Sequence, residues 1–561
     1  MSWVNDIRVI VGLDFGTTYS GFSLCHVDSD PNDIKTNDEW HGEVGKYKTN
    51  TVLQYSDDYK EVKSWGQQAL SKKVNKKSKE IERKPVELFK LYLGNCLEKN
   101  RPKLPLDYKK VIADYLREIG KLIIETIPKY WEGIDFMENV LLVLTVPAGF
   151  SDFDIAIMRE CVFNAGLINN KYSEKLQFTT EPEAAAIYCI KSLSEHNLTK
   201  PGTTFMIVDC GGGTVDLTTR QLLEGNQLGE ITERSGDFCG STFIDKKFIE
   251  LLEREVGKPA MDSFIDKHYG QLQYLVQKFC QDFKLQFTGD NPNFNCEIDI
   301  EELAPALKEY VTDLDLLEEK EWVIIIDFNT IKSMFDTVID RIIQMIRIQL
   351  DNSKTCSAIF LVGGFGQSKY LQKRIKEEFC HLVENISIPS HPIAAVVRGA
   401  AIYGRSLQQS NLKSMSNLKC IIATRVLNNT FGTKVSPKWK EGDPPERREP
   451  NGLIHKFRRI IERKTEVKID QEIVVGRYAP SVPNQTKLKF DLFYTKEQNA
   501  DYCDEPGVEL LGEFLINLPV SLGTKRICEL SISFGDMEIK AKAINETTGQ
   551  HYQTKFNFHD L

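Results

Sequence analysis

The chain has 561 residues, too many for a single hydrophobic core, which predicts two to four domains. Its 41% hydrophobic and 27% charged content is typical of a soluble globular protein. A formal net charge of −9 and the lack of any apolar run near the ~20 residues of a membrane span disfavour nucleic acid, anionic lipid and membranes as partners. Thirteen cysteines without a CxxC pair, and an N-terminus without signal-peptide features, favour the cytoplasm, with the nucleus as a second location.

The first four hundred residues alternate apolar strands with amphipathic helices, which predicts an α/β domain over residues 1–405. Residues 331–350 carry apolar side chains at helical spacing, which predicts a helix facing the core. The basic stretch 72–84 contains acidic residues and no aromatic one, so a solvated helix face is favoured over a nucleic-acid site. The predicted strands cover residues 8–13, 21–27, 139–146, 205–208, 215–219 and 359–362.

The character of the chain changes after a polar segment at residues 406–417, which we interpret as a linker. Beyond it, strand-like alternation separated by turn residues predicts an all-β domain over residues 418–561. Residues 527–534 and 537–544, joined by Gly535 and Asp536, are a candidate hairpin.

Two segments of the α/β domain, residues 12–21 and 208–216, share one pattern: an apolar strand, an aspartate, a Gly/Thr turn and a second strand. Glycines let backbone N–H groups approach phosphate oxygens, and threonines add hydroxyl donors. Asp14 and Asp209 at the strand ends are suited to a hydrated Mg²⁺, which needs only one or two carboxylates. Either segment alone could be a plain glycine-rich hairpin, but the pair favours a nucleotide held between two turns.

A third segment, residues 361–368, follows an apolar strand and precedes a predicted helix at 369–379. Its glycine pair would let a flat adenosine lie against the backbone. A strand–Gly-Gly–helix turn is common by itself, and it gains meaning from its position after two phosphate hairpins.

Together these segments resemble the phosphate-1, phosphate-2 and adenosine motifs of the actin/hexokinase/heat-shock-70 ATPase superfamily. Residues 145–150, 180–186 and 397–401 are also similar to heat-shock-70 signatures. Among the branches, the chain most resembles the divergent "heat shock 70 kDa protein 12" group. The resemblance implies an α/β actin-like ATPase domain with two lobes and ribonuclease H-like halves, followed by an all-β sandwich without a helical lid.

The resemblance also implies catalytic roles. Asp14 and Asp209 would organise Mg²⁺ through water, Lys90 would contact the γ-phosphate, and Glu181 would orient the attacking water. The alternatives are that Lys90 is an ordinary surface lysine on an amphipathic helix and that Glu181 is a helix-start residue before Pro182. The residues implied to bind ATP or ADP are Gly16, Thr17, Thr18, Tyr19, Gly211, Gly212, Gly213, Thr214, Gly240, Lys284, Gly363, Gly364, Phe365 and Gln367.

The chain departs from the family around the adenine. Gln367 and Leu285 stand where arginines are expected to sandwich the base, and Gln281 stands where a ribose-binding glutamate is expected. A late aspartate expected near Ile393 is missing. Each lost cation–π contact is worth roughly 0.5–2 kcal/mol, which predicts weaker binding of ATP and ADP.

Two functions follow as hypotheses. The first is a chaperone-like ATPase with weak hydrolysis, whose β domain binds polypeptide clients or a protein partner. The second is a nucleotide-sensing scaffold with little turnover, which the departures around the adenine and in the linker favour. A metabolite kinase on the same fold would leave the β domain unexplained.

Overall fold

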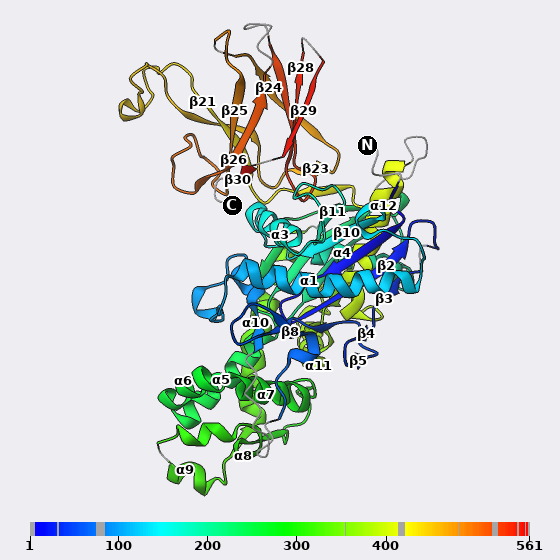
Figure 1. The fold of residues 1–561 in the computed structure, drawn as a ribbon, viewed down its shortest axis with the longest axis vertical. Helices are drawn as coiled ribbons and strands as arrows, with labels where there is room; N and C mark the ends of the chain where they lie inside the picture. Colours follow the sequence, from blue (N-terminus) through cyan, green and yellow to red (C-terminus); the bar gives the residue numbers. More distant parts are fainter. Residues whose placement is uncertain are drawn as a thin grey trace. The chain divides into compact units, whose positions relative to one another are not determined.

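The computed structural model describes residues 6–30, 33–73, 85–312, 314–353, 355–412, 421–480, 482–518, 526–546, 549–555 and 557–558. Figure 1 shows the course of the chain. It divides into two compact units. Unit 1 contains Met1–Gly149, Glu160–Thr219 and Ser235–Lys419, and unit 2 contains Phe150–Arg159, Arg220–Arg234 and Cys420–Leu561.

Two sheets with the same strand order are built largely from unit 1. In both, three sequential strands form one side of the sheet, and the first of them is flanked on its other side by two later parallel strands. The first has the order β3 (Lys35–Thr36), β2 (Tyr19–His26), β1 (Val9–Asp14), β10 (Val140–Val146) and β11 (Leu176–Thr180). The second has the order β14 (Leu228–Glu230), β13 (Val215–Leu222), β12 (Thr204–Cys210), β18 (Ala358–Val362) and β19 (Asn385–Ser387). β13 continues from unit 1 into unit 2, where it pairs with β14.

The central strands of both sheets are buried along their whole length, as the apolar runs of parallel strands require. Helices α4 (Glu181–Glu195) and α12 (Ala395–Leu412) pack against each other and against the first sheet. This contact is close, because a Cβ atom at Gly399 would lie 1.7 Å from the carbonyl oxygen of Ala184. Helix α1 (Tyr108–Thr126), capped by Asp107, buries one apolar side and runs alongside the strands in Figure 1.

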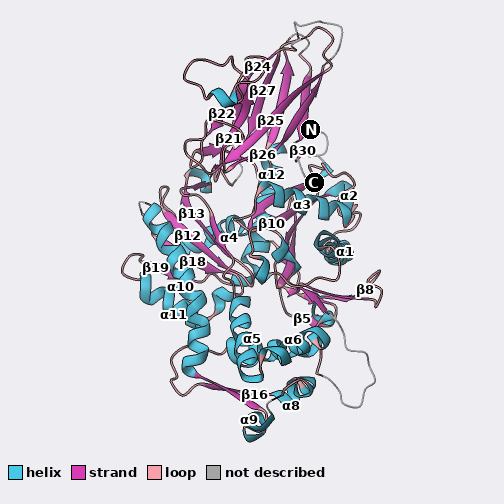
Figure 2. Cartoon of the chain, turned by 90° about the vertical axis from the view of Figure 1, so that its left-hand side faces the viewer, coloured by secondary structure: helices cyan, strands magenta, loops and turns pink. Residues whose placement is uncertain are grey.

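The second sheet shares one hydrophobic core with the helices drawn beside it in Figure 2. They include α5 (Thr242–Val256), α10 (Phe328–Asn352) and α11 (Lys369–Phe379). Most apolar positions of the helix predicted at 331–350 are buried in this core, although Ile348 is 53% exposed. The helix begins earlier than predicted because Asp327 accepts a hydrogen bond of 2.8 Å from the Thr330 N–H. The helices α6 (Lys258–Lys267) and α7 (Tyr269–Phe279) follow α5, and α7 runs into a π-helical turn, Cys280–Lys284.

The remaining strands of unit 1 form small additions to this framework. β6 (Thr49–Asn50) pairs with β2, and β15 (Ser235–Asp237) pairs with β13. The small sheets are β4 (Glu39–Trp40) with β5 (Glu43–Val44), β7 (Val52–Tyr55) with β8 (Val62–Trp65) and β9 (Pro85–Glu87), and β16 (Asn295–Asp299) with β17 (Val323–Asp327). None of the helices in the described ranges combines the length with the apolar character that a membrane crossing requires.

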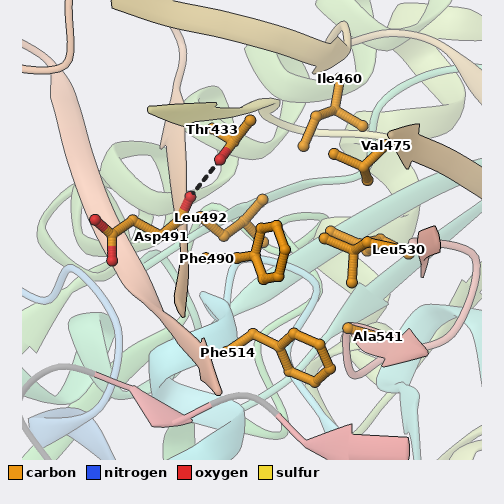
Figure 3. Close-up of a pocket in the computed structure, with 10 residues that line it drawn as sticks. Thr433, Ile460, Val475, Phe490, Asp491, Leu492, Phe514, Leu530 and Ala541 are labelled. Atoms are coloured by element: carbon orange, nitrogen blue, oxygen red, sulfur yellow. Dashed lines mark hydrogen bonds between the residues drawn. The ribbon is translucent and has the colours of Figure 1, made fainter. Parts of the chain in front are cut away.

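The C-terminal part of unit 2 is a β-sandwich. One sheet has the order β22 (Lys456–Ile461), β21 (Thr430–Val435), β25 (Lys487–Thr495), β26 (Val508–Asn517) and β30 (Asn557–Phe558). The other has the order β24 (Glu472–Tyr478), β27 (Cys528–Ser533), β28 (Lys540–Asn545) and β29 (His551–Lys555). Figure 3 shows Phe490, Phe514 and Leu530 around a small cavity between the two sheets, in a core that both sheets share. The Thr433 hydroxyl donates a 2.9 Å hydrogen bond to the Asp491 carbonyl beside it.

Unit 2 also contains two segments that the sequence places within the N-terminal domain, residues 150–159 and 220–234. Arg159 makes two 2.6 Å bonds to the carboxylate of Glu538. Glu230, completely buried, accepts 2.9 Å from Arg220 and 2.7 Å from the Val426 N–H. Arg159 and Glu538 are 379 positions apart, so no local pattern predicts their ion pair, whereas Arg220 and Glu230 are partners on the adjacent strands β13 and β14.

Two boundaries differ from the sequence prediction. Residues 406–412 of the segment interpreted as a linker continue helix α12, in which Gln408 is 1% exposed. Residues 413–417 of the predicted linker lie outside the described residues, as does most of the basic stretch 72–84. In the predicted hairpin, Ser533 pairs with Lys540, so the connection covers residues 534–539 rather than Gly535 and Asp536 alone.

Candidate functional site

Parallel pairing brings the predicted catalytic carboxylates to one edge of each sheet. In the first sheet Asp14 pairs with Thr145, and Val146 pairs with Thr180, directly before Glu181. In the second sheet Asp209 pairs with Val362, directly before Gly363. The carboxyl ends of adjacent parallel strands are where α/β sheets place their functional groups. The local strand signals therefore position Asp14 and Glu181 on one sheet and Asp209 on the other.

The two Gly/Thr turns meet each other. A Cβ atom at Gly212 would lie 2.1 Å from the Thr18 hydroxyl oxygen, and one at Gly213 would lie 2.5 Å from the Thr17 hydroxyl oxygen. Only glycine permits so close an approach of the second turn to the first. The threonines of the first turn thus lie directly against the glycine backbone of the second turn.

Each turn is held by its own hydrogen bonds. In the first, the Gly16 N–H donates to the Ser20 hydroxyl at 3.2 Å, and the Thr51 hydroxyl donates to the Gly16 carbonyl at 2.9 Å. In the second, the Gly211 N–H donates to the Thr214 carbonyl at 2.9 Å. The N–H groups of residues 240–242 donate to the carbonyls of residues 211–213 at 2.9–3.2 Å, which places Gly240 directly behind this turn. These bonds hold the backbone of both turns in place.

Lys90 is buried between the first turn and Glu181. Its ammonium donates 2.7 Å to the Glu181 carboxylate and 2.5 Å to the Phe15 carbonyl, with only 4% of the side chain exposed. It lies on the short turn Phe89–Tyr92, so the alternative of a surface lysine on an amphipathic helix is wrong. Glu181 is the first residue of α4 and also the ion-pair partner of Lys90, so its place at the helix start does not exclude a role in the site.

A second lysine, Lys48, lies in the site although the sequence prediction does not include it. Its ammonium is 2.5 Å from Asp14, whose other carboxylate oxygen accepts a 3.2 Å bond from the Thr145 hydroxyl. Burial works to lower the pKa of Lys48, but the negative charges of Asp14, Asp209 and Glu181 raise it. Lys48 lies outside every Gly/Thr motif, so no local signal identifies it.

Carboxylates outnumber lysines in this cluster. Asp14, Glu181, Asp209 and Asp216 face Lys48 and Lys90, four acids against two bases. Burial, and next the charge of Glu181, raises the pKa of Asp209 well above its ordinary value. The same two causes raise the pKa of Asp216 to about 7, although its carboxylate accepts a 2.8 Å bond from the Ala148 N–H. The carboxylates of the cluster therefore repel one another.

This excess negative charge fits a hydrated divalent cation. Mg²⁺ keeps several water ligands and needs only one or two carboxylates, which Asp14 and Asp209 could supply from the carboxyl ends of β1 and β12. Within the described ranges, no group of three or more His, Cys, Asp or Glu residues could hold a metal ion directly.

Few side chains among the residues predicted to bind adenosine are placed to contact a ligand. Lys284 bonds Asp245 at 2.5 Å and the Ser241 carbonyl at 3.3 Å, behind the second phosphate turn. Gly363, with a φ of +80°, lies so close to Asp209 that a Cβ atom there would be 2.4 Å from the carboxylate. Phe365 is packed in the hydrophobic core, so only its backbone could meet a ligand.

The two positions where arginines are expected, and the one where a glutamate is expected, carry exposed uncharged side chains. Gln367, Gln281 and Leu285 are all exposed, Leu285 at 66%. A Cβ atom at Gly364 would meet nothing within 4 Å, and Tyr19 is 47% exposed. No side chain among these three positions is charged, so none could supply a cation above an adenine ring.

Comparison with known proteins adds independent information. The chain is 25% identical to heat shock 70 kDa protein 12A of Mus musculus, covering 98% of this chain and 91% of that protein. It is 23% identical to heat shock 70 kDa protein 12B of Homo sapiens over the same shares. The resemblance to the heat shock 70 kDa protein 12 group is confirmed.

More distant members of the heat-shock-70 family match as well. A chaperone protein HscA homolog of Rickettsia bellii (strain RML369-C) is 24% identical, covering 89% of this chain and 69% of that protein. Residues 199–387 match a family described as a domain of unknown function, DUF8340. This homology implies an actin-like ATPase domain followed by a β domain, in agreement with the repeated sheets and the sandwich.

Proposed function

We propose that this heat-shock-70-like chain is an ATP-binding, chaperone-like ATPase with slow hydrolysis. One observation supports it above all: Thr17 and Thr18 of one turn meet Gly212 and Gly213 of the other beside a buried cluster of carboxylates and lysines. We propose that the two repeated sheets form the two lobes of the ATPase domain. The triphosphate of ATP would then lie between the turns.

The residues of the cluster have distinct proposed roles. Backbone N–H groups and threonine hydroxyls of the turns bind the phosphates, and Lys90 donates to the γ-phosphate. Glu181, oriented by Lys90 at 2.7 Å, positions the attacking water. Asp14 and Asp209 hold Mg²⁺ through its waters, and that ion supplies charge neutralisation when bound. Phosphoryl transfer depends mainly on such positioning and electrostatics.

Nucleotide binding is tested by calorimetric titration of ATP and ADP, with Mg²⁺, into the wild type and an Asp209→Asn variant. We expect saturable binding by the wild type and at least tenfold weaker binding by the variant. A wild type indifferent to both nucleotides would refute the proposed function. The exposed Leu285 and Gln367 predict a weaker affinity than an arginine-lined adenine site would give.

The β-sandwich is the proposed site for unfolded polypeptide clients. Full-length protein is the right material for a peptide-binding assay, because residues 150–159 and 220–234 belong to the same compact unit as the sandwich. We expect extended apolar peptides to bind with an affinity that changes between ATP and ADP. Failure to bind any member of a broad peptide library would refute the client-binding part of the proposal.

A nucleotide-sensing scaffold is the alternative, and one observation favours it. Lys48 occupies one carboxylate oxygen of Asp14, a group that should be free to organise the waters of Mg²⁺. Single-turnover hydrolysis separates the two functions. A rate well above background that Asp209→Ala abolishes supports the ATPase, whereas tight binding without turnover supports the scaffold. Cytoplasmic or nuclear location remains a prediction.

A further inference from the structure

The backbone around β6 positions Lys48 next to the first phosphate turn. Lys48 directly precedes β6, whose Thr49 and Asn50 pair with Ser20 and Tyr19 of β2. A Cβ atom at Gly21 would lie 2.6 Å from the Tyr47 carbonyl and 2.9 Å from the Lys48 Cγ atom. A glycine on β2 therefore lets this segment pass close to the first phosphate turn, with the Lys48 side chain directed to Asp14.

The Lys48 ammonium is a fixed charge within the carboxylate cluster. Its side chain is 10% exposed, and its partner Asp14 is 4% exposed, with 2.5 Å between nitrogen and oxygen. The other charged groups that face it are Asp209 and Glu181, and Lys90 already neutralises Glu181 through its own 2.7 Å bond. At such burial a charge–charge interaction is screened much less than on the surface.

A cation held at this place does part of the work of a metal ion. It neutralises Asp14, which would otherwise repel the phosphates of a nucleotide at the adjoining turn. It also engages a carboxylate oxygen that would accept hydrogen bonds from the waters of Mg²⁺. Both effects reduce what a divalent ion contributes to the binding of a nucleotide.

We propose that Lys48 is a built-in cation of the phosphate site, which lets the chain bind adenosine di- and triphosphates with little dependence on Mg²⁺. The inference rests on the proposed nucleotide-binding function and specifies how that site obtains its positive charge. Lys48 acts here as a residue that determines the cation requirement of the site.

The test measures ADP affinity by calorimetry in excess Mg²⁺ and again in EDTA, for full-length protein. For the wild type, we expect the dissociation constant to change by less than about tenfold between the two conditions. Lys48→Met should weaken binding in EDTA by about tenfold or more and change binding in Mg²⁺ much less, because the ion then supplies the lost charge.

Two further variants make the result decisive. Lys48→Arg keeps the charge and should keep metal-free binding, which also guards against a misfolded methionine variant. Lys46→Met removes a lysine two residues before Lys48 in the same segment. Its side chain is 68% exposed and pairs with Glu43. This variant should leave both affinities unchanged, since the charge of Lys46 is outside the cluster. An equal effect of Lys46→Met would show a long-range field and overturn the proposal.

The outcomes separate this inference from the proposed function. A wild type that binds ADP in Mg²⁺ but loses it in EDTA overturns the role of Lys48 and leaves nucleotide binding intact. The role of Lys48 is also overturned if Lys48→Met has the same ratio of ADP affinities in Mg²⁺ and in EDTA as the wild type. A wild type that binds in neither condition refutes the proposed function itself.

Discussion

The buried pair of Lys90 and Glu181 provides the sharpest test of the site, through the variant Lys90→Met. The lysine is 4% exposed and the glutamate 12%, and their charged atoms are 2.7 Å apart. Removing one partner of such a pair leaves the other charge buried and costs about 3–5 kcal/mol. We expect the lower end, about 3 kcal/mol at pH 8, because part of the cost is relieved if Glu181 takes up a proton.

The surface pair of Lys247 and Glu250 is the matched control. Its charged atoms are also 2.7 Å apart, but the two side chains are 39% and 59% exposed. For Lys247→Met we expect a loss of roughly 0–1 kcal/mol, because water screens the pair. Although the two pairs have the same separation, Lys90→Met should therefore lose severalfold more unfolding free energy than Lys247→Met.

The assay is urea unfolding followed by tryptophan fluorescence. Trp40, Trp65, Trp131 and Trp322 lie in unit 1, so the signal reports mainly on the unit that contains the site. The loss in Lys90→Met should be smaller at pH 5 than at pH 8. Burial already raises the pKa of Glu181, and loss of Lys90 raises it further, so the penalty grows as pH rises toward that value.

Equal losses in the two lysine variants would refute the reasoning. So would a double variant, Lys90→Met with Glu181→Gln, that is no more stable than Lys90→Met alone. Removing both charges should recover part of the lost stability, because no uncompensated charge then remains buried.

Three other predictions follow from the same geometry. Gly212→Val should reduce ATP affinity at least tenfold in calorimetry, because its Cβ atom would lie 2.1 Å from the Thr18 hydroxyl and push the turns apart. Nucleotide-free protein should melt at lower temperature as pH rises from 5 to 7, because the pKa of Asp216 is raised to about 7 and its ionisation disfavours the fold. Asp216→Asn should flatten that slope in scanning calorimetry, and an unchanged slope would contradict the assignment. Gly399→Ala should lower the melting temperature by several degrees, because its methyl group meets the α4 backbone at 1.7 Å, whereas Gly364→Ala, with open space around it, should not.

The local parts of the site could be predicted from the sequence. Alternating and continuous apolar runs specify strands, and a glycine–threonine turn after an aspartate specifies a hairpin whose backbone a ligand can approach closely. Helix α11 spans the predicted residues, and β1, β10, β12 and β18 lie within two residues of their predicted bounds. These features depend on neighbours in the chain, so the sequence alone determines them.

The charge balance of the site was decided only by the tertiary structure. Lys48 reaches Asp14 across 34 positions, and Lys90 reaches Glu181 across 91. Arg159 meets Glu538 across 379 positions, which assigns residues 150–159 to the unit of the β-sandwich. Whether a lysine is solvated or buried against a carboxylate depends on which distant segments pack around it, and no periodicity or motif in its own neighbourhood records that.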